Sequence, residues 1–184
     1  SLSQQSVLTH TFSAPQSFDA VFQPCTVQDT VIINEINYHS AAYHDPADWV
    51  ELYNPTATSI NISAWVFSDK AYEEGFVIPQ DVVLQPQEFV VLARDTAQFH
   101  SLFPECVQYT GPLGFGLSGS GETLCLWDSS ALLVDSLSYS DQSPWPETPD
   151  GQGPTLELID AASDNSDPAH WQASTHFGSP GAAN

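Results

Sequence analysis

Short apolar runs separated by turn-forming residues recur along the chain from about residue 30 onward. In several of them apolar and polar positions alternate with a period of two, the pattern of a strand with one buried face. Proline, glycine and small polar residues fill the intervals, as in "YNPTATS" and "TGPLGFGLSGSG". This pattern predicts an all-β sandwich with strands near residues 30–38, 48–53, 60–67, 75–78, 88–93, 107–110, 122–127, 131–139 and 155–159. The alternation assigns these side chains to its core: Ile33 or Ile36, Val50, Leu52, Trp65, Val91, Leu124 and Leu126.

One short helix interrupts the strand pattern in "RDTAQFHSLFP". Asp95 can cap its first turn, Phe99 and Leu102 have helical spacing, and Pro104 ends it. Residues 1–29 differ from the remainder, with two short alternating segments around "APQS". We interpret them as a linker or the end of a preceding module, and residues 30–184 as one domain.

The charge balance is strongly acidic. Two basic residues, Lys70 and Arg94, stand against 23 acidic ones, for a formal net charge of −21. Nucleic acid is therefore excluded as a direct partner, because phosphate binding requires Lys and Arg. Anionic membrane surfaces are disfavoured for the same reason, and no apolar run approaches the ~20 residues needed to insert across a bilayer. Most carboxylates must sit in water, accept backbone hydrogen bonds or bind metal cations.

Three cysteines are present, without a CxxC pair. Cys106 and Cys125 flank the Gly-rich loop symmetrically. If "VQYT" and "GETL" form a hairpin closed by that loop, the two cysteines face each other at a separation that permits a disulfide. The alternative is that both are small apolar core residues. With the bridge formed, Cys25 is free or paired outside the chain.

The Gly-rich loop itself spells G-x-G-x-x-G through Gly114, Gly116 and Gly119. In a phosphate-binding loop that motif opens a helix. Here "ETLCLWD" follows, which alternates like a strand, so a wide loop is favoured. No G-x-S-x-G nucleophile motif occurs.

Glu35 and Glu51 lie on neighbouring predicted strands. Paired carboxylates can act as in a glycosidase, so a hydrolase using these two residues is one alternative. The structural alternative places Glu51 in solvent with Trp49 and Tyr53. Glu35 lies in an apolar run, and a buried glutamate accepts backbone N–H groups or meets a cation such as Arg94. We favour the structural role for both.

The loop after the first predicted strand carries His39 and His44, whose flexible setting disfavours zinc. Calcium tolerates loops and needs several oxygen ligands. Adjacent loops at one end of a sandwich give a candidate calcium site of carboxylates: Asp45, Asp48, Asp69, Glu73 and Glu74.

Several motifs, in order, resemble the lamin tail domain family, and more narrowly its bacterial branch in secreted, multidomain proteins. They are "VIINEINY", "DWVELYNPT", "INISAWVFSD", "FVVLARD", "GLSGSGETLCLWD", "PDGQGPTLELID", "DPAHW" and "GSPGAAN", spread over residues 30–184. The resemblance implies an immunoglobulin-like β-sandwich without catalytic residues. The residues at the family's motif positions are then determinants of the fold: Glu35, Trp49, Glu51 and Trp65.

These observations favour a non-catalytic, immunoglobulin-like interaction or spacer module of a secreted or cell-surface bacterial protein. Its expected partners are a protein or polysaccharide and neighbouring domains of the same chain. The alternatives are a calcium-stabilised binding module and the hydrolase described above. Three aromatic residues are candidates for sugar stacking or, alternatively, for the core: Tyr43, Trp145 and Trp171.

Overall fold

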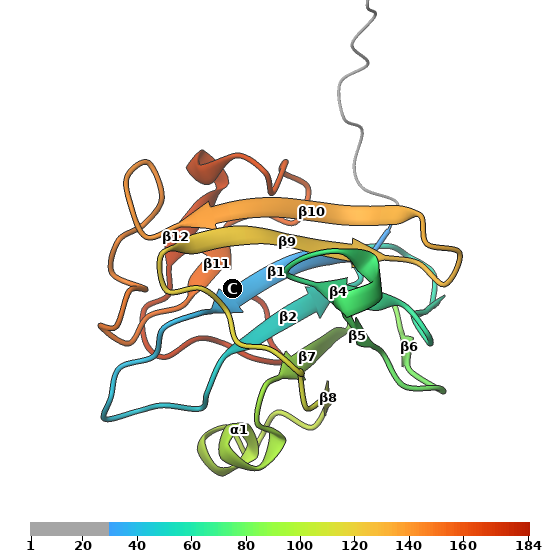
Figure 1. The fold of residues 1–184 in the computed structure, drawn as a ribbon, viewed down its shortest axis with the longest axis horizontal. Helices are drawn as coiled ribbons and strands as arrows, with labels where there is room; N and C mark the ends of the chain where they lie inside the picture. Colours follow the sequence, from blue (N-terminus) through green and yellow to red (C-terminus); the bar gives the residue numbers. More distant parts are fainter. Residues whose placement is uncertain (1–29) are drawn as a thin grey trace, which may run out of the picture.

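The computed structural model describes residues 30–184, so the interpretation of residues 1–29 and the state of Cys25 lie outside the described residues. Two β-sheets face each other across a shared core (Figure 1). The larger sheet has six strands in the order β12 (Trp171–Ala173), β11 (Leu156–Leu158), β1 (Ile32–Asn37), β2 (Trp49–Tyr53), β7 (Phe89–Ala93) and β8 (Tyr109–Thr110). Neighbouring strands in this sheet pair antiparallel, except β7 and β8, which pair in parallel.

The second sheet has four strands in the order β10 (Leu133–Ser140), β9 (Gly121–Trp127), β4 (Val66–Ser68) and β5 (Phe76–Val77). A separate two-stranded ribbon joins β3 (Ile60–Asn61) to β6 (Val83–Leu84). The predicted strand near residues 60–67 is thus divided between β3 and β4, and β6 and β12 were not predicted. No helix in the described part of the chain is long and apolar enough to cross a membrane.

The predicted helix is present as α1 (Thr96–Leu102). Asp95 caps it, since its Oδ1 accepts hydrogen bonds of 3.0 Å from the backbone N–H groups of Ala97 and Gln98. Two short 3₁₀ segments, η1 (Tyr72–Glu74) and η2 (Pro168–His170), complete the fold.

Apolar side chains from both sheets meet in one large core cluster. The predicted core positions are all buried: Ile33, Ile36, Val50, Leu52, Trp65, Val91, Leu124 and Leu126. Val91 belongs to a second cluster, on the outer face of the six-stranded sheet, where Trp49, Ala93, Phe99 and Cys106 pack together. Helix α1 covers this part of the outer face (Figure 1).

The predicted hairpin between residues 107–110 and 122–125 is wrong. β8 pairs with β7, whereas β9 pairs with β10, so that Cys125 lies opposite Ser136. Cys106 and Cys125 are both free thiols, and the predicted disulfide is not formed. Cys106 instead fills the second apolar cluster beneath α1. The Gly-rich segment connects two different sheets, which symmetrical spacing in sequence cannot show.

Candidate functional site

Three glutamates occupy neighbouring register positions on three adjacent strands of the six-stranded sheet. Glu35 on β1 pairs with Glu157 on β11 and with Glu51 on β2. Their sequence neighbours Ile36 and Val50 point into the core between the sheets. Alternation along a strand therefore sends the three carboxylates to the outer face. We call Glu35, Glu51 and Glu157 the carboxylate row.

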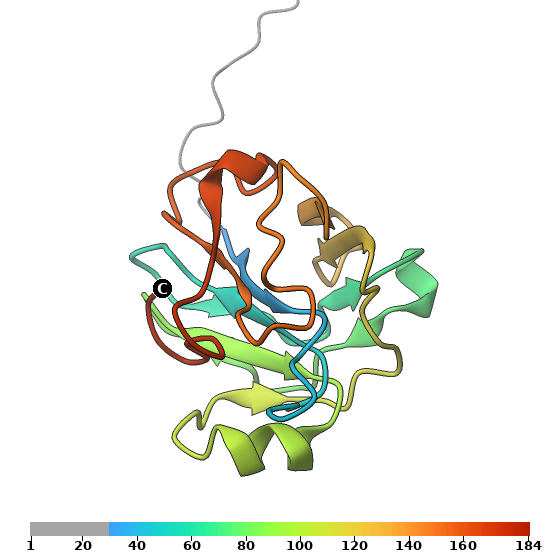
Figure 2. The same ribbon diagram turned by 90° about the vertical axis from the view of Figure 1, so that its left-hand side faces the viewer.

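The row is covered by the C-terminal segment, residues 178–184, which lies across the sheet as the dark red end of the chain in Figure 2. The backbone N–H of Ser179 donates to both oxygens of Glu35, at 3.1 and 3.3 Å, and its hydroxyl donates to Glu157 at 3.3 Å. The backbone N–H of Gly181 donates to Glu51 Oε2 at 2.5 Å. One short segment thus supplies a donor to every member of the row.

Two further side chains donate to Glu35 and Glu51. Thr155 Oγ1 donates to Glu35 Oε1 at 2.5 Å, and Asn34 Nδ2 donates to Glu51 Oε1 at 3.0 Å. Asn34 reaches Glu51 because the register of β1 against β2 shifts between Ile33 and Glu35, a β-bulge that leaves Asn34 as the extra residue.

Gly178 lets the C-terminal segment approach this closely. Its φ of +98° lies in the region that favours glycine, and a Cβ there would sit 2.5 Å from Glu35 Oε1 and 3.0 Å from Trp49 Cζ2. Any side chain at this position would therefore displace the segment or the carboxylate.

The three glutamates of the carboxylate row are buried with no cationic side chain from the described part of the chain beside them, and this raises their pKa values. Desolvation raises the pKa of Glu51 to about 8, against the hydrogen bonds from Gly181 and Asn34. Desolvation also raises the pKa of Glu35 well above its ordinary value, and the nearby charge of Glu51 adds to the effect. Burial raises the pKa of Glu157 in the same direction. Within residues 30–184, Arg94 pairs with Asp48 and not with any of these glutamates.

This geometry corrects the solvent-facing alternative for Glu51. Glu51, Glu35 and Trp49 each have 0% of their surface exposed. Trp49 packs edge-on against Phe99 and Phe103, and Trp65 lies in the main core. With both carboxylates sealed under the C-terminal segment, neither can contact a substrate in this conformation.

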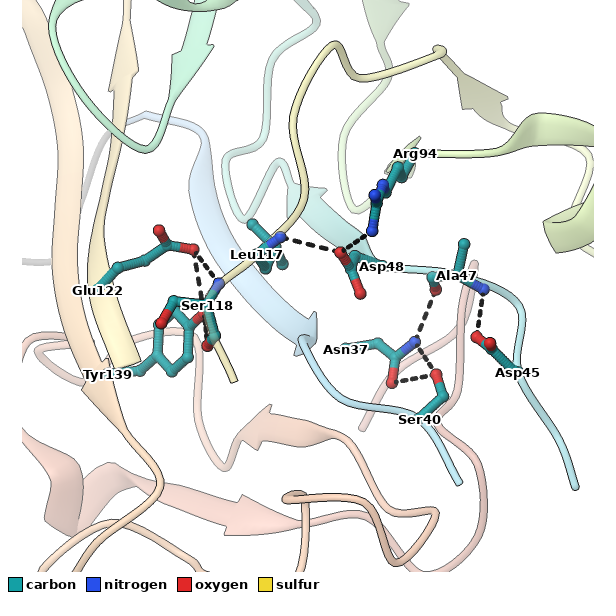
Figure 3. A network of polar contacts seen from close by, with 10 residues as sticks. All are labelled: Asn37, Ser40, Asp45, Ala47, Asp48, Arg94, Leu117, Ser118, Glu122 and Tyr139. Carbon is teal, nitrogen blue, oxygen red and sulfur yellow. Dashed lines mark hydrogen bonds and ion pairs between the residues drawn. The ribbon is translucent and has the colours of Figure 1, made fainter. Parts of the chain in front are cut away.

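A second carboxylate arrangement holds the Gly-rich loop (Figure 3). Asp48 Oδ2 accepts from the backbone N–H of Leu117 at 2.9 Å and from Arg94 Nη1 at 3.1 Å. Glu122 Oε1 accepts from the next backbone N–H, that of Ser118, at 2.7 Å and from Tyr139 Oη at 3.1 Å. Two backbone N–H groups of the loop are thus already bound by carboxylates and are not free to bind a phosphate.

The structure does not bring the predicted calcium ligands together. Asp45 and Asp48 line one hollow beside Arg94, whereas Asp69 and Glu74 line another beside Lys70. Glu73 is exposed on η1. Across residues 30–184, no group of three or more His, Cys, Asp or Glu side chains could hold a metal ion.

The histidines considered as zinc ligands and the aromatic residues considered for sugar stacking mostly contact other parts of the domain. His39 pairs with Asp150 at 2.5 Å, and His44 stacks on Phe177 with ring centroids 3.9 Å apart. Trp145 and Trp171 belong to the core, which leaves only Tyr43, 78% exposed, on the surface.

Sequence reasoning missed Glu157, Glu122 and the donors of the C-terminal segment. Glu157 stands between two leucines in "LEL", the same apolar setting that drew attention to Glu35. No local pattern marks Ser179 or Gly181, because their partners lie 144 and 130 positions earlier.

The fold agrees with the comparison of the chain with known protein families. The description Lamin Tail Domain matches residues 25–141, which is more than half of the chain. β11, β12 and the C-terminal segment follow the matched range, yet they complete the same six-stranded sheet. No curated protein matches the chain. On the strength of the family match and the β-sandwich, the chain belongs to the lamin tail domain family.

Proposed function

We propose that this lamin tail domain is a non-catalytic, immunoglobulin-like interaction or spacer module. The observation that carries the proposal is the state of Glu35 and Glu51, the paired carboxylates on which a hydrolase would depend. Both are fully buried, and both act as hydrogen-bond acceptors for the C-terminal segment. A catalytic acid or base must reach a substrate within hydrogen-bond distance, and the burial of both carboxylates supports a non-catalytic role.

Glycosidase activity can be tested with a matched variant. The chain and its Glu35→Gln/Glu51→Gln double variant are incubated with soluble glucan, xylan and chitin oligomers, and reducing ends are measured. The expected result is no product above buffer for either protein. Turnover by the chain that the double variant lacks, with unchanged circular dichroism, would overturn the proposal.

We also propose that the module belongs to a secreted or cell-surface multidomain bacterial protein. Support comes from the resemblance of its motifs to that branch of the family and from its net charge of −21, which favours solubility. Protease treatment of intact source cells tests the location. Removal of the domain from intact cells is expected, and protection until lysis would contradict it.

The partner we propose is a protein or polysaccharide, and not nucleic acid. The chain has two basic residues, of which Arg94 is engaged by Asp48. A calcium-stabilised form of the module has weaker support, since the carboxylates suggested for it lie in separate hollows.

A further inference from the structure

The outer face of the six-stranded sheet is left open at one end. Tyr53 and Phe89 pair across β2 and β7, on the same face as Glu51 and Val91. Their rings are stacked, with centroids 4.4 Å apart and planes 18° apart. Helix α1 and the C-terminal segment cover neighbouring parts of this face, whereas Tyr53 and Phe89 are only partly buried. We call Tyr53 and Phe89 the aromatic pair.

Two hollows adjoin the aromatic pair. The first, of about 400 Å3, is lined by Phe89 together with polar side chains of the β6–β7 turn and of residues 105–108. The second, of about 180 Å3, is lined by residues that include Tyr53, Phe89, Asn34, Asp160 and Asn184. Both hollows therefore combine an aromatic ring with amide and carboxylate groups.

The lining side chains are held in place by their own hydrogen bonds. Tyr53 Oη donates to Gln87 Oε1 at 2.6 Å, and Gln87 Nε2 donates to the Pro55 carbonyl oxygen at 2.9 Å. Gln108 Nε2 donates to Glu88 Oε1 at 2.5 Å. A ligand would thus meet a surface that is already ordered, which lowers the entropic cost of binding.

Other polar atoms of the hollows remain available. Gln85 Nε2, Gln108 Oε1 and the Glu105 carboxylate have no hydrogen-bond partner among residues 30–184, although Gln85 Oε1 and Gln108 Nε2 are bonded. In the second hollow, Asp160 Oδ1 accepts from Ala162 while Oδ2 is free within the same residues. The first hollow thus offers a donor and several acceptors, and the second offers an acceptor.

This chemistry favours one class of ligand. Sugar hydroxyls both donate and accept hydrogen bonds, and side-chain amides do the same. Aromatic rings provide an apolar surface for the faces of sugar rings. The two hollows share the Phe89 ring, so they offer contacts to more than one unit of a polymer. With carboxylates in both hollows and a net charge of −21, an anionic polymer is disfavoured.

We propose that the aromatic pair and its two hollows form a binding site for a neutral polysaccharide. The proposal rests on the module function proposed above and supplies its partner class. Amide shifts of the ¹⁵N-labelled chain are followed during titration with cellohexaose, xylohexaose, maltohexaose and chitohexaose. At least one of these is expected to bind with a Kd of about 0.1–1 mM and to shift Tyr53, Phe89, Gln108 and Asp160.

Matched variants identify the contribution of the ring. Phe89→Leu is expected to weaken binding by about 5- to 10-fold, because it removes the stacking surface. Phe76→Leu, at a similarly half-buried position on β5, is expected to change it by less than about twofold. Equal losses in both variants, or no shift with any of the four oligosaccharides, would overturn the proposal.

A tetralysine peptide tests whether the site binds a cationic partner instead of a neutral polysaccharide. Glu105→Gln keeps a hydrogen-bond acceptor but removes the charge, so sugar binding is expected to survive it. The proposal would be overturned if tetralysine bound at these residues, if Glu105→Gln abolished that binding, and if no sugar bound. The partner would then be cationic. Sugar binding with turnover would keep the site but refute the non-catalytic function, so the two failures are distinguishable.

Discussion

Glu35 and Glu51 lie directly opposite each other on β1 and β2, and residues two positions apart in one segment donate a backbone N–H to each carboxylate. The two carboxylates therefore hold the C-terminal segment against the sheet by hydrogen bonds. Two partly buried carboxylates are satisfied in the same way, because Asp48 and Glu122 accept backbone N–H groups of the Gly-rich loop.

The carboxylate row predicts that the fold is more stable in mildly acidic solution. Because the pKa of Glu51 is raised to about 8 in the folded protein, its stabilising contribution is complete below its ordinary value of 4.5. That contribution is lost as the pH rises through about 8. The pKa values of Glu35 and Glu157 are raised in the same direction.

The free energy of unfolding, measured with urea, is expected to be larger at about pH 6 than at about pH 9, by roughly 2–3 kcal/mol from Glu51. Glu51→Gln is the control, since it cannot ionise and should reduce this difference. A stability that rises with pH over this range, or a difference unchanged by Glu51→Gln, would contradict the prediction.

Gly178→Ala is expected to detach the C-terminal segment. The new Cβ would lie 2.5 Å from Glu35 Oε1 at a φ of +98°, so we expect a loss of about 2 kcal/mol or more in unfolding free energy. Hydrogen exchange at the Ser179 and Gly181 amides should accelerate. Gly114→Ala is the matched control, because no atom lies within 4 Å of its Cβ position. Equal effects of the two substitutions would count against the role of Gly178.

The alternation of apolar residues was sufficient to predict the long strands. β1, β2, β7, β9 and β10 each turn a row of apolar side chains toward the same core, and that period survives in the sequence. The two-residue strand β6 is too short to carry a period. The parallel pairing of β7 with β8 follows a helical connection, so no local turn signal could predict it.

The sequence could not predict what covers the outer face of the larger sheet. Alternation predicted that Glu51 faces away from the main core, which is right, and solvent was the natural expectation for that side. What covers Glu51 is Gly181, 130 positions later in the chain. The separation of Asp48 from Asp69 was also hidden in the sequence. The loop with Asp48 joins two strands of the six-stranded sheet, whereas the loop with Asp69 joins two strands of the four-stranded sheet.

Calcium is expected to act on this protein only as a general divalent ion. Because Asp45, Asp48 and Asp69 are divided between two hollows, we expect no specific calcium site among them. The melting temperature in millimolar calcium should agree within about 1 °C with that in equal magnesium, since both ions screen the net charge alike. A rise specific to calcium and abolished by EDTA would restore the calcium hypothesis.

The two cysteines are expected to differ in reactivity. Cys106 is buried beside the C-terminal segment, where a Cβ on Gly181 would lie 3.3 Å from its Sγ. Burial, followed by the nearby charge of Glu51, raises the pKa of this thiol to about 11. Cys125 lies partly exposed on β9, and burial raises the pKa of its thiol as well. Because the thiolate is the reactive form and must be accessible, iodoacetamide should alkylate Cys125 at least about tenfold faster than Cys106 in the native chain.

Peptide mass spectrometry after timed alkylation measures both rates, and alkylation in urea should equalise them. Gly178→Ala should accelerate the reaction of Cys106, since detaching the C-terminal segment removes its cover, whereas Gly114→Ala should leave it unchanged. A peptide that links Cys106 to Cys125 before reduction, or faster alkylation of Cys106 in the native chain, would contradict this arrangement.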